Sequence, residues 1–401
     1  MNSKARTVSV MNASSDTSSQ SGLSYPPGIL SQPQLEDAFA KRILASAAPL
    51  TDGQIQPASL DLRLGAKAWR VQASFLPGAD HKVADKLVDL AMHEIDLTNG
   101  AVLEKGCVYI AELLESAHLP QGLTAIANPK SSTGRLDVFT RMIVDYADEF
   151  EMAPAGYSGA LYAEISPRTF SVLVRQGSRL SQLRLRSGRA HISDDDMMAL
   201  QDKSGLTHGE GIVNHKIKDG IPLSVDLSGK AHSLMPGVVG WRARKHAGLI
   251  DVDQVGVYPV SGFWEKVTLA DLNAGGLVLN PDEFYILASQ EYVTVPAEYA
   301  AEMTAYDTRI GEFRAHYAGF FDPGFGMPEL GAGETRAVLE VRSHDVPFLI
   351  EEGQTVCRLV YEPLSLVPDA LYGARGSGSH YQAQGLQLAK HFLPITGGES
   401  A

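Results

Sequence analysis

Gly100-Ala-Val-Leu-Glu-Lys-Gly-Cys-Val-Tyr-Ile110 returns 176 positions later in the chain as Gly276-Leu-Val-Leu-Asn-Pro-Asp-Glu-Phe-Tyr-Ile286. The same spacing carries Leu119-Pro120 onto Val295-Pro296, Glu164 onto Glu340, and Gly177 onto Gly353. Because these anchors share one spacing, the sequence predicts a duplicated domain. The period is far too long for one unit of a solenoid.

The length and composition agree with two folded domains. A chain of 401 residues is too long for one ordinary core. Hydrophobic residues make up 44% and charged residues 20%, as in a folded globular protein. We expect a disordered tail over residues 1–25, a first domain over 26–192, an acidic linker over 193–215, and a second domain with a Gly-rich tail over 216–401.

Local patterns predict mostly strands with a few short helices. Ser31 and Gln34 form a capping box in the sequence, and Leu30 and Leu35 flank it as a hydrophobic staple, so a helix should begin there. A second helical pattern covers roughly residues 80–93. Elsewhere apolar and polar residues alternate between Gly, Pro and Asn breaks, which is typical of a compact β fold.

Charge and cysteine content narrow the function and the compartment. A formal net charge of -13 argues against sequence-independent nucleic-acid binding, which needs many cations, although a small anion needs only one basic pocket. Cys107 and Cys357 are the only cysteines, so a reducing, cytoplasmic location is expected. The first 25 residues contain no apolar run that suits a signal peptide or a membrane span.

Common catalytic motifs are missing from the sequence. His208-Gly209-Glu210 matches half of a zinc deaminase signature, but no C-x-x-C follows it, and a solvated histidine is the better interpretation. Neither a G-x-x-x-x-G-K-[ST] phosphate loop nor a G-x-G-x-x-G fingerprint occurs. The sequence therefore predicts no metal site and no kinase or dehydrogenase of the common types.

Three sequence blocks, in order, resemble the dCTP deaminase and dUTPase superfamily. They are Gln56-Pro-Ala-Ser-Leu-Asp-Leu-Arg-Leu-Gly65, Asn128-Pro-Lys-Ser-Ser-Thr-Gly-Arg-Leu136 and Gly156-Tyr-Ser-Gly-Ala-Leu-Tyr-Ala-Glu-Ile165. The resemblance covers residues 28–190 well and the second copy more loosely. It implies a mainly β chain of two tandem distorted jelly-roll barrels of the dUTPase-like fold, assembled as a homotrimer with sites between neighbouring barrels.

The resemblance also implies an activity, the hydrolytic deamination of dCTP to dUTP and ammonia. Without a metal, a carboxylate must take the proton of the attacking water. Glu164 matches the catalytic glutamate of the family. Ser131 and Arg135 match its S-S-x-x-R element, whose hydroxyl and guanidinium hold the water and the developing tetrahedral centre.

Other residues are expected to bind the triphosphate. Lys130 and Ser132 belong to the same element as Ser131, and Arg179 and Gln182 belong to a strand rich in arginine. A solvated basic edge strand is the alternative for that strand. The Gly-rich segment near the C-terminus resembles one that closes over the phosphates, with a functionless tail as the alternative. Its candidate residues are Arg375, Ser377, Ser379, Tyr381 and Gln384.

Each copy departs from the family pattern. In the first, Pro154 stands where the sugar-binding Asp is expected, and Asp145 is a candidate replacement. The second copy keeps Asp322 and Glu340. With a two-residue shift from the repeat spacing, Arg309 matches Arg135 there, but Ala305 stands where Ser131 does. The second copy is therefore either structural or a contributor of residues to a shared site.

Cofactors, partners and rival functions follow from the same resemblance. We expect no tightly bound cofactor, Mg²⁺ only as the counter-ion of the triphosphate, and dTTP as a candidate effector. A dUTP pyrophosphatase, alone or combined with the deaminase, is the nearest rival function. A nucleotide-binding regulator without turnover is the rival from another class.

Overall fold

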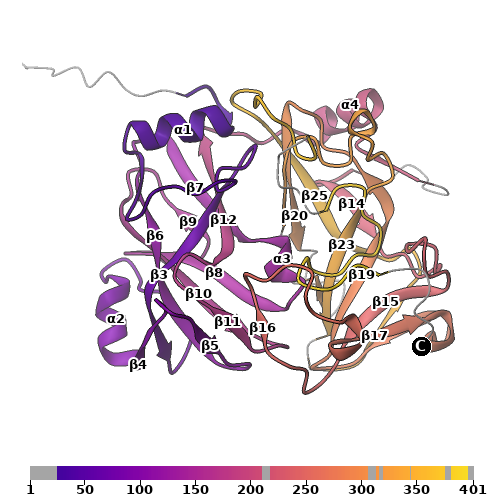
Figure 1. Cartoon of the computed structure of the whole chain (residues 1–401). Helices are drawn as coiled ribbons and strands as arrows, with labels where there is room; N and C mark the ends of the chain where they lie inside the picture. The colour runs from indigo at the N-terminus through magenta and orange to yellow at the C-terminus, as the bar shows by residue number, and fades with distance from the viewer. Residues whose placement is uncertain are drawn as a thin grey trace, which may run out of the picture.

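The two copies of the sequence repeat form two halves that lie side by side (Figure 1). A computed structural model describes residues 25–209, 217–305, 313–315, 319–343, 345–374 and 381–395. Apart from Tyr25, the expected tail lies outside the described residues. In Figure 1 the first half runs from indigo to magenta, and the second half runs on to yellow.

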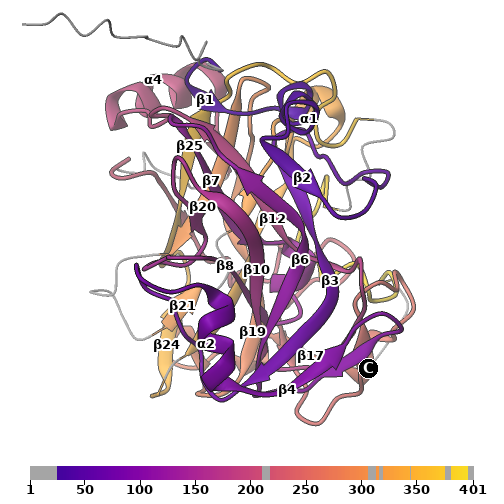
Figure 2. The ribbon, with the colours of Figure 1, turned by 90° about the vertical axis from the view of Figure 1, so that its left-hand side faces the viewer.

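The first half is built around one large antiparallel sheet with the order β8-β10-β6-β3-β12-β7-β9. Its strands are β1 (Gly28–Ile29), β2 (Leu44–Ser46), β3 (Leu60–Val71), β4 (Ala91–Asp96), β5 (Ala101–Leu103), β6 (Val108–His118), β7 (Leu123–Pro129), β8 (Val138–Val144), β9 (Met152–Ala153), β10 (Ser158–Pro167), β11 (Val172–Val174) and β12 (Arg179–Ser187). The helices are α1 (Gln32–Ala40), α2 (Val83–Leu90) and α3 (Ser131–Gly134). Figure 2 shows β3, β6 and β10 from the side, with α2 below them.

The second half has two larger sheets, β17-β15-β19-β23-β21 and β14-β25-β20-β22, and a two-stranded sheet of β18 and β24. Its strands are β13 (Thr207–His208), β14 (Ile221–Ser224), β15 (Val238–Ala243), β16 (Ile250–Asp251), β17 (Trp264–Thr268), β18 (Gly276–Leu279), β19 (Phe284–Val293), β20 (Tyr299–Ala305), β21 (Phe313–Ala315), β22 (Phe320–Phe321), β23 (Arg336–Ser343), β24 (Phe348–Glu351) and β25 (Thr355–Pro363). Three short 3₁₀ turns, Val260–Gly262, Leu269–Asp271 and Pro328–Leu330, connect them.

Strand pairing shows that the duplication extends to the register of the sheets. Glu164 on β10 pairs with Ile110 on β6, and Glu340 on β23 pairs with Ile286 on β19. The sequence spacing of the repeat is therefore also a structural equivalence. The expected mainly β, dUTPase-like architecture with a few short helices is confirmed.

The two helices expected in the first half form close to the predicted positions. Before α1, the Gln34 Oε1 atom accepts a hydrogen bond of 3.1 Å from the backbone N–H of Ser31, which is one arm of a capping box. Leu35 and Ala38 on α1 are fully buried. Helix α2 covers the end of β3 and buries Val83 and Leu87.

The segment expected to be a linker has a structure of its own. It contains α4 (Asp194–Ser204), which begins at Ser193, where the hydroxyl accepts a hydrogen bond from the N–H of Asp196. Met197 and Leu200 of α4 pack into the core of the second half. The described part of 193–215 is therefore a packed element of the second half rather than an extended connection.

The halves share core and backbone contacts. The largest hydrophobic cluster contains first-half residues such as Phe170 together with Trp264 and Phe392 of the second half. Strand β16 of the second half pairs in parallel with β11 of the first. The two halves are therefore joined at their boundary by a shared hydrophobic cluster and by strand pairing. Within the described part of the chain, no helix is long and apolar enough to cross a membrane.

Candidate active site

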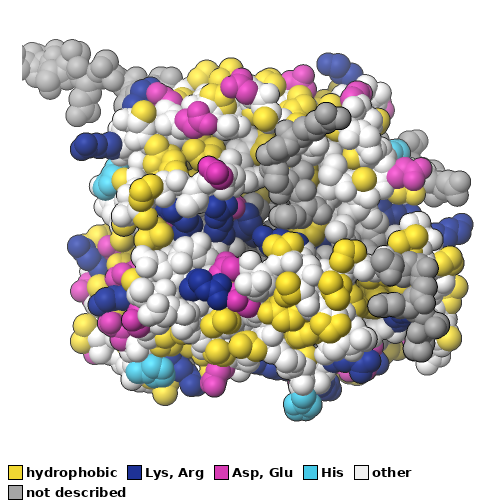
Figure 3. Space-filling model, in the orientation of Figure 1, with side chains coloured by type: hydrophobic (Ala, Val, Ile, Leu, Met, Phe, Trp, Pro, Cys, Tyr) yellow, Lys and Arg dark blue, Asp and Glu magenta, His cyan; other side chains and the backbone are white. Residues whose placement is uncertain are grey.

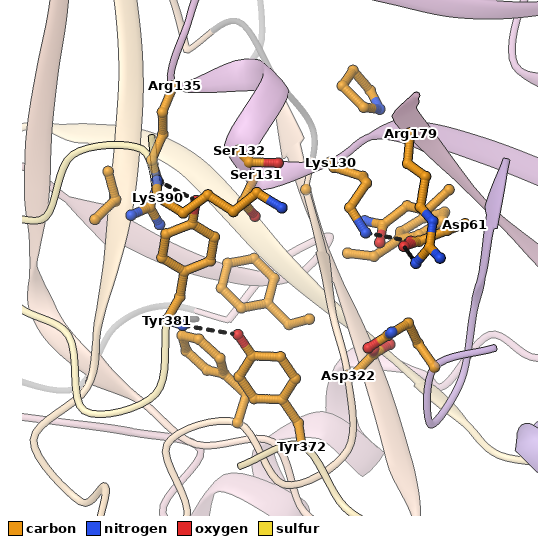
Figure 4. Close-up of a pocket in the computed structure, with 18 of the residues that line it drawn as sticks. Asp61, Lys130, Ser131, Ser132, Arg135, Arg179, Asp322, Tyr372, Tyr381 and Lys390 are labelled. Carbon is orange, nitrogen blue, oxygen red and sulfur yellow. Dashed lines mark hydrogen bonds and ion pairs between the residues drawn. The ribbon is translucent and has the colours of Figure 1, made fainter. Parts of the chain in front are cut away.

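A cavity of about 320 Å³ is lined by side chains from both halves. Lys and Arg side chains gather in a hollow near the middle of the face shown in Figure 3. The close-up in Figure 4 shows residues of the first half, such as Ser131 and Lys130, around the same space as Asp322 and Tyr381 of the second. The cavity therefore belongs to the pair of halves rather than to either one.

The serine and arginine element of the first half lies on a tight turn at one wall. Strand β7 ends at Pro129, and the N–H groups of Thr133 and Gly134 donate to the carbonyl of Lys130 at 2.8 and 2.9 Å. Ser, Thr and Gly favour such a turn over a longer helix. The turn brings Ser131, Ser132 and Arg135 to the cavity wall.

Arg135 is held almost completely buried by residues near the C-terminus. Its Nη2 donates to the Oε1 of Gln384 at 2.8 Å, and its Nη1 donates to the carbonyl of Gln387 at 3.0 Å. The guanidinium also lies over the ring of Tyr381, with Cζ 4.0 Å from the ring centroid. These contacts leave its Nε facing Glu340, 4.0 Å from Oε1.

Glu340 on β23 is the carboxylate that the structure brings to this element. Its side chain is 4% exposed and lines the cavity. Burial raises the pKa of Glu340 to about 8, because desolvation outweighs the opposing effect of Arg135. A carboxyl with such a pKa can both accept and donate a proton near neutral pH.

Glu164, the expected catalytic residue, lies elsewhere. Its Oε1 accepts hydrogen bonds from Arg141 Nε at 3.1 Å and Arg141 Nη2 at 2.5 Å, and both residues belong to the first half. It does not line the cavity. The structure thus corrects the expected grouping. Ser131 and Arg135 meet Glu340 of the second copy instead of Glu164 of their own.

A cluster of cations lies at another part of the cavity. Lys130 and Arg179 both contact the buried carboxylate of Asp61, the latter at 3.3 Å from Nη1 to Oδ2. Lys390 also lines the cavity, and burial lowers the pKa of its ammonium group, assisted by the nearby charge of Lys130. Gln182 completes this wall. Three cations around one carboxylate leave a net positive charge there.

The arginine-rich strand is not at an edge. Strand β12 lies between β3 and β7, so a solvated basic edge strand is wrong. Only Arg179 and Gln182 of this strand face the cavity. Arg184 is fully buried, and its Nη2 contacts Asp322 Oδ1 at 3.1 Å.

Asp322 fills the position at which the family pattern needs an acid. It lines the cavity next to Phe321 and Phe325, and burial raises its pKa. Asp145, the candidate replacement in the first half, is instead used by α2, since its Oδ1 accepts from the N–H of Val83 at 2.9 Å. Of these two aspartates, Asp322 lines the cavity and Asp145 does not.

The segment near the C-terminus closes one side of the cavity. Tyr372, Tyr381 and Gln384 all line it, and the N–H of Tyr381 donates to the Tyr372 hydroxyl at 3.2 Å (Figure 4). The described ends of this segment are therefore packed at the cavity. The remaining candidates lie outside the described residues: Arg309, Arg375, Ser377 and Ser379.

Most of the site residues expected from the sequence and described by the structure line the cavity. The structure brings together ten expected residues: Lys130, Ser131, Ser132, Arg135, Arg179, Gln182, Asp322, Glu340, Tyr381 and Gln384. The sequence analysis gave no role to Asp61, Tyr372 or Lys390. Asp61 lies inside the Gln56–Gly65 block and could have been found from it, and Tyr372 lies three residues before Arg375 of the Gly-rich segment. Lys390 follows no motif, and only its fold position reveals it.

Among the residues that the structure describes, no group of three or more His, Cys, Asp or Glu side chains is arranged to hold a metal ion. His208 is exposed, and its Nε2 lies 2.8 Å from the carbonyl oxygen of Gly333.

The fold and the cavity are those of an enzyme for a small anionic substrate, because a buried carboxyl with a raised pKa and a cation cluster line one cavity. Residues 26–189 match the family described as 2'-deoxycytidine 5'-triphosphate deaminase (DCD) N-terminal domain. Residues 193–392 match the corresponding C-terminal domain. The chain therefore belongs to the 2'-deoxycytidine 5'-triphosphate deaminase family.

Individual proteins support this membership. The crystal structure of 2'-deoxycytidine 5'-triphosphate deaminase from Agrobacterium tumefaciens is 52% identical, with a TM-score of 0.78 over 84% of this chain and 99% of that one. A dCTP deaminase of Halorubrum lacusprofundi is 31% identical over 39% of this chain and 75% of its own length. A "dCTP deaminase, dUMP-forming" of Methanobrevibacter smithii is 30% identical, but this chain spans only 61% of its length, and the match covers 31% of this chain.

Proposed function

We propose that this chain deaminates dCTP to dUTP and ammonia in the cavity between its halves, with Glu340 as the proton-transfer group. One observation carries the proposal. Ser131 and Arg135 of the first half face Glu340 of the second, and Lys130, Arg179 and Lys390 line the same cavity. Family membership and the relatives named dCTP deaminase support the substrate.

The chemistry needs one group that moves protons twice. Water adds to C4 of cytosine, and its two protons end on ring N3 and on the amino group, which leaves as ammonia. Glu340 accepts the proton from water and then donates it, and its raised pKa suits both steps. Arg135 and the Ser131 hydroxyl stabilise the water and the charge that develops on it.

The remaining cavity residues bind the other parts of the nucleotide. Lys130, Arg179 and Lys390 neutralise phosphates, and Asp61 keeps the first two in place until the substrate arrives. Asp322, fixed by Arg184, accepts a hydrogen bond from the deoxyribose. Phe320, Phe321 and Phe325 supply the apolar surface against the sugar and base.

The reaction proceeds without zinc in this proposal, and Mg²⁺ accompanies the triphosphate. The sequence supports this, because its two cysteines are far apart and no C-x-x-C occurs. Metal analysis of active protein tests it. Stoichiometric zinc, with activity lost to a zinc-selective chelator, would contradict the idea.

The homotrimer and the dTTP effector stay proposals. A site made by two halves of one chain requires no second chain for the residues named here. Light scattering of the full chain gives the oligomer directly, and a threefold mass is expected. Titration with dTTP during turnover tests the effector.

Product analysis with dCTP and Mg²⁺ tests the proposed function itself. Equal amounts of dUTP and ammonia are expected. Release of dUMP and pyrophosphate would favour the combined reaction that the M. smithii relative's name describes. Tight dCTP binding without any product would favour the regulator instead.

A further inference from the structure

Another ion pair between the halves, Asp137 with Arg342, lies two residues along the chain from Arg135 and Glu340. Asp137 is completely buried just after the turn that carries Arg135. Arg342 lies two residues after Glu340 on β23. Its Nε and Nη2 donate to Asp137 Oδ2 at 2.9 and 2.8 Å, so the guanidinium clamps one carboxylate oxygen.

The two pairs are in register with each other. Residues two apart on a strand share a face, so Glu340 and Arg342 both point towards the first half. Opposite them, Arg135 and Asp137 are also two residues apart. The first half thus presents a cation and then an anion, and the second half presents an anion and then a cation. Only one alignment of the two segments satisfies both pairs.

Local backbone and side-chain contacts fix Asp137 in this position. Its φ of +56° is left-handed, which Asp tolerates better than most residues, and its N–H donates to the carbonyl of Gly134 at 2.8 Å. Thr169 Oγ1 donates to Asp137 Oδ2 at 2.5 Å and accepts from Arg342 Nη2 at 2.9 Å. Because these contacts hold the Asp137 carboxylate in one place, it can fix the position of the Arg342 guanidinium that it binds.

We propose that Asp137 and Arg342 are a positioning pair, which holds Ser131 and Arg135 against Glu340 and keeps a negative charge beside that carboxyl. This inference rests on the proposed function of Glu340. The first half has no counterpart of Arg342, because Ser166 stands at that position on the equivalent strand β10.

The charge of Asp137 also acts on Glu340. Four titratable or charged groups interact electrostatically with Glu340: Arg135 and Asp137 from the turn, Tyr381 from the C-terminal segment, and Cys357 from β25. Arg342, two residues along β23, is bound to Asp137. Asp137 adds to the effect of burial and raises the pKa of Glu340, whereas Arg135 lowers it. Losing the Asp137 charge should therefore lower this pKa.

The test is the pH dependence of kcat/KM for dCTP in Asp137→Asn. Because the ionised form of Glu340 accepts the proton from water, its pKa sets the acid limb. We expect this limb to move to lower pH by about half a unit or more. We also expect kcat to fall about tenfold or more as the turn loses its anchor. Asp137→Glu, which keeps the charge, should keep the limb at the wild-type pH.

A matched control breaks a different ion pair between the halves. Arg175 and Asp251 contact each other at 2.7 Å, and neither lines the cavity. Asp251→Asn should leave the acid limb and kcat unchanged. A shift of the limb in this control equal to that in Asp137→Asn would overturn the proposal, because any loosening of the halves would then suffice.

Asp137→Asn leaves the Arg342 guanidinium buried without its partner, and the protein can then fail to fold. A second variant keeps the proposal testable in that case. Asp137→Asn combined with Arg342→Gln buries no unpaired charge and should show the same fall in kcat, whereas its acid limb should move less, because a cation near Glu340 is removed together with the anion. A wild-type limb and wild-type kcat in either folded variant contradict the positioning pair. Glu340→Gln, assayed in parallel, separates the two ideas. If it stays active, the proposed role of Glu340 fails regardless of Asp137.

Discussion

Glu340 and Glu164 occupy equivalent strand positions but have opposite surroundings. Glu340 lines a cavity, and its nearest cation is Arg135 of the other half, with 4.0 Å between Nε and Oε1. Glu164 is held by two nitrogens of Arg141, a residue of its own half, and Arg141 in turn stacks 3.4 Å from the ring centroid of Phe150. The Glu340 carboxylate is thus open to a cavity, whereas the Glu164 carboxylate is occupied by an arginine of its own half.

This difference shows that the duplication preserves the strand position of the carboxylate and not its surroundings. In the proposed mechanism, the catalytic carboxylate works with a serine and an arginine from the opposite half. The first half supplies both through Ser131 and Arg135, whereas the second half has Ala305 at the equivalent of Ser131. Under this proposal the halves divide the work, one carrying the turn and the other the carboxylate.

The serine gives the largest expected effect apart from the glutamates themselves. Ser131→Ala removes the hydroxyl that acts together with Glu340, so kcat should fall at least ~10²-fold. Ser166→Ala is the control, because Ser166 is buried on β10 away from the cavity. Equal losses of kcat in the two variants would mean that the site between the halves is not the catalytic one.

The cations should act mainly on substrate affinity. Arg179→Gln or Lys390→Met should raise the KM for dCTP by roughly 10- to 100-fold, the usual scale of a charged hydrogen bond. Arg175→Gln serves as the matched control, since Arg175 pairs with Asp251 and Asp253 outside the cavity. Unchanged KM in both cavity variants would place the phosphates elsewhere.

The raised pKa of Glu340 predicts a smaller effect on stability. The folded protein keeps this proton up to about pH 8, whereas an unfolded chain loses it near the ordinary value of 4.5. The stabilisation from this group is therefore complete below about pH 4.5 and is lost as pH rises through 8. Glu340→Gln cannot ionise, so its Tm should fall less than that of the wild type between pH 6 and pH 9. Parallel Tm curves in calorimetry would contradict this.

Much of the fold could be predicted from local patterns. The sequence repeat predicted the two halves, and the Ser31–Gln34 pattern predicted the start of α1. The alternation of apolar and polar residues predicted a mainly β fold. The segment 193–215 was expected to be a linker because most of its residues are acidic or small. Its helix nevertheless packs Met197 and Leu200 against the second core. A periodic pattern of only two apolar positions is too weak a signal to distinguish a short helix from a linker.

The site was predicted in its residues but not in its grouping. Ser131, Arg135 and Glu340 were all identified, yet both glutamates fit the strand pattern equally well in sequence. The choice between them depends on which half Arg135 faces, and that is set by long-range packing. Arg141, which occupies Glu164, lies 23 positions earlier in the chain and carries no motif. No local pattern could have revealed that pairing.

The deamination rates of Glu340→Gln and Glu164→Gln, measured side by side with dCTP, test the division of work most directly. Both changes keep the shape of the side chain and remove its ability to accept a proton. We expect turnover to fall at least ~10²-fold in Glu340→Gln and to stay within about threefold of wild type in Glu164→Gln. Near-normal turnover in Glu340→Gln, or the larger loss in Glu164→Gln, would contradict the account.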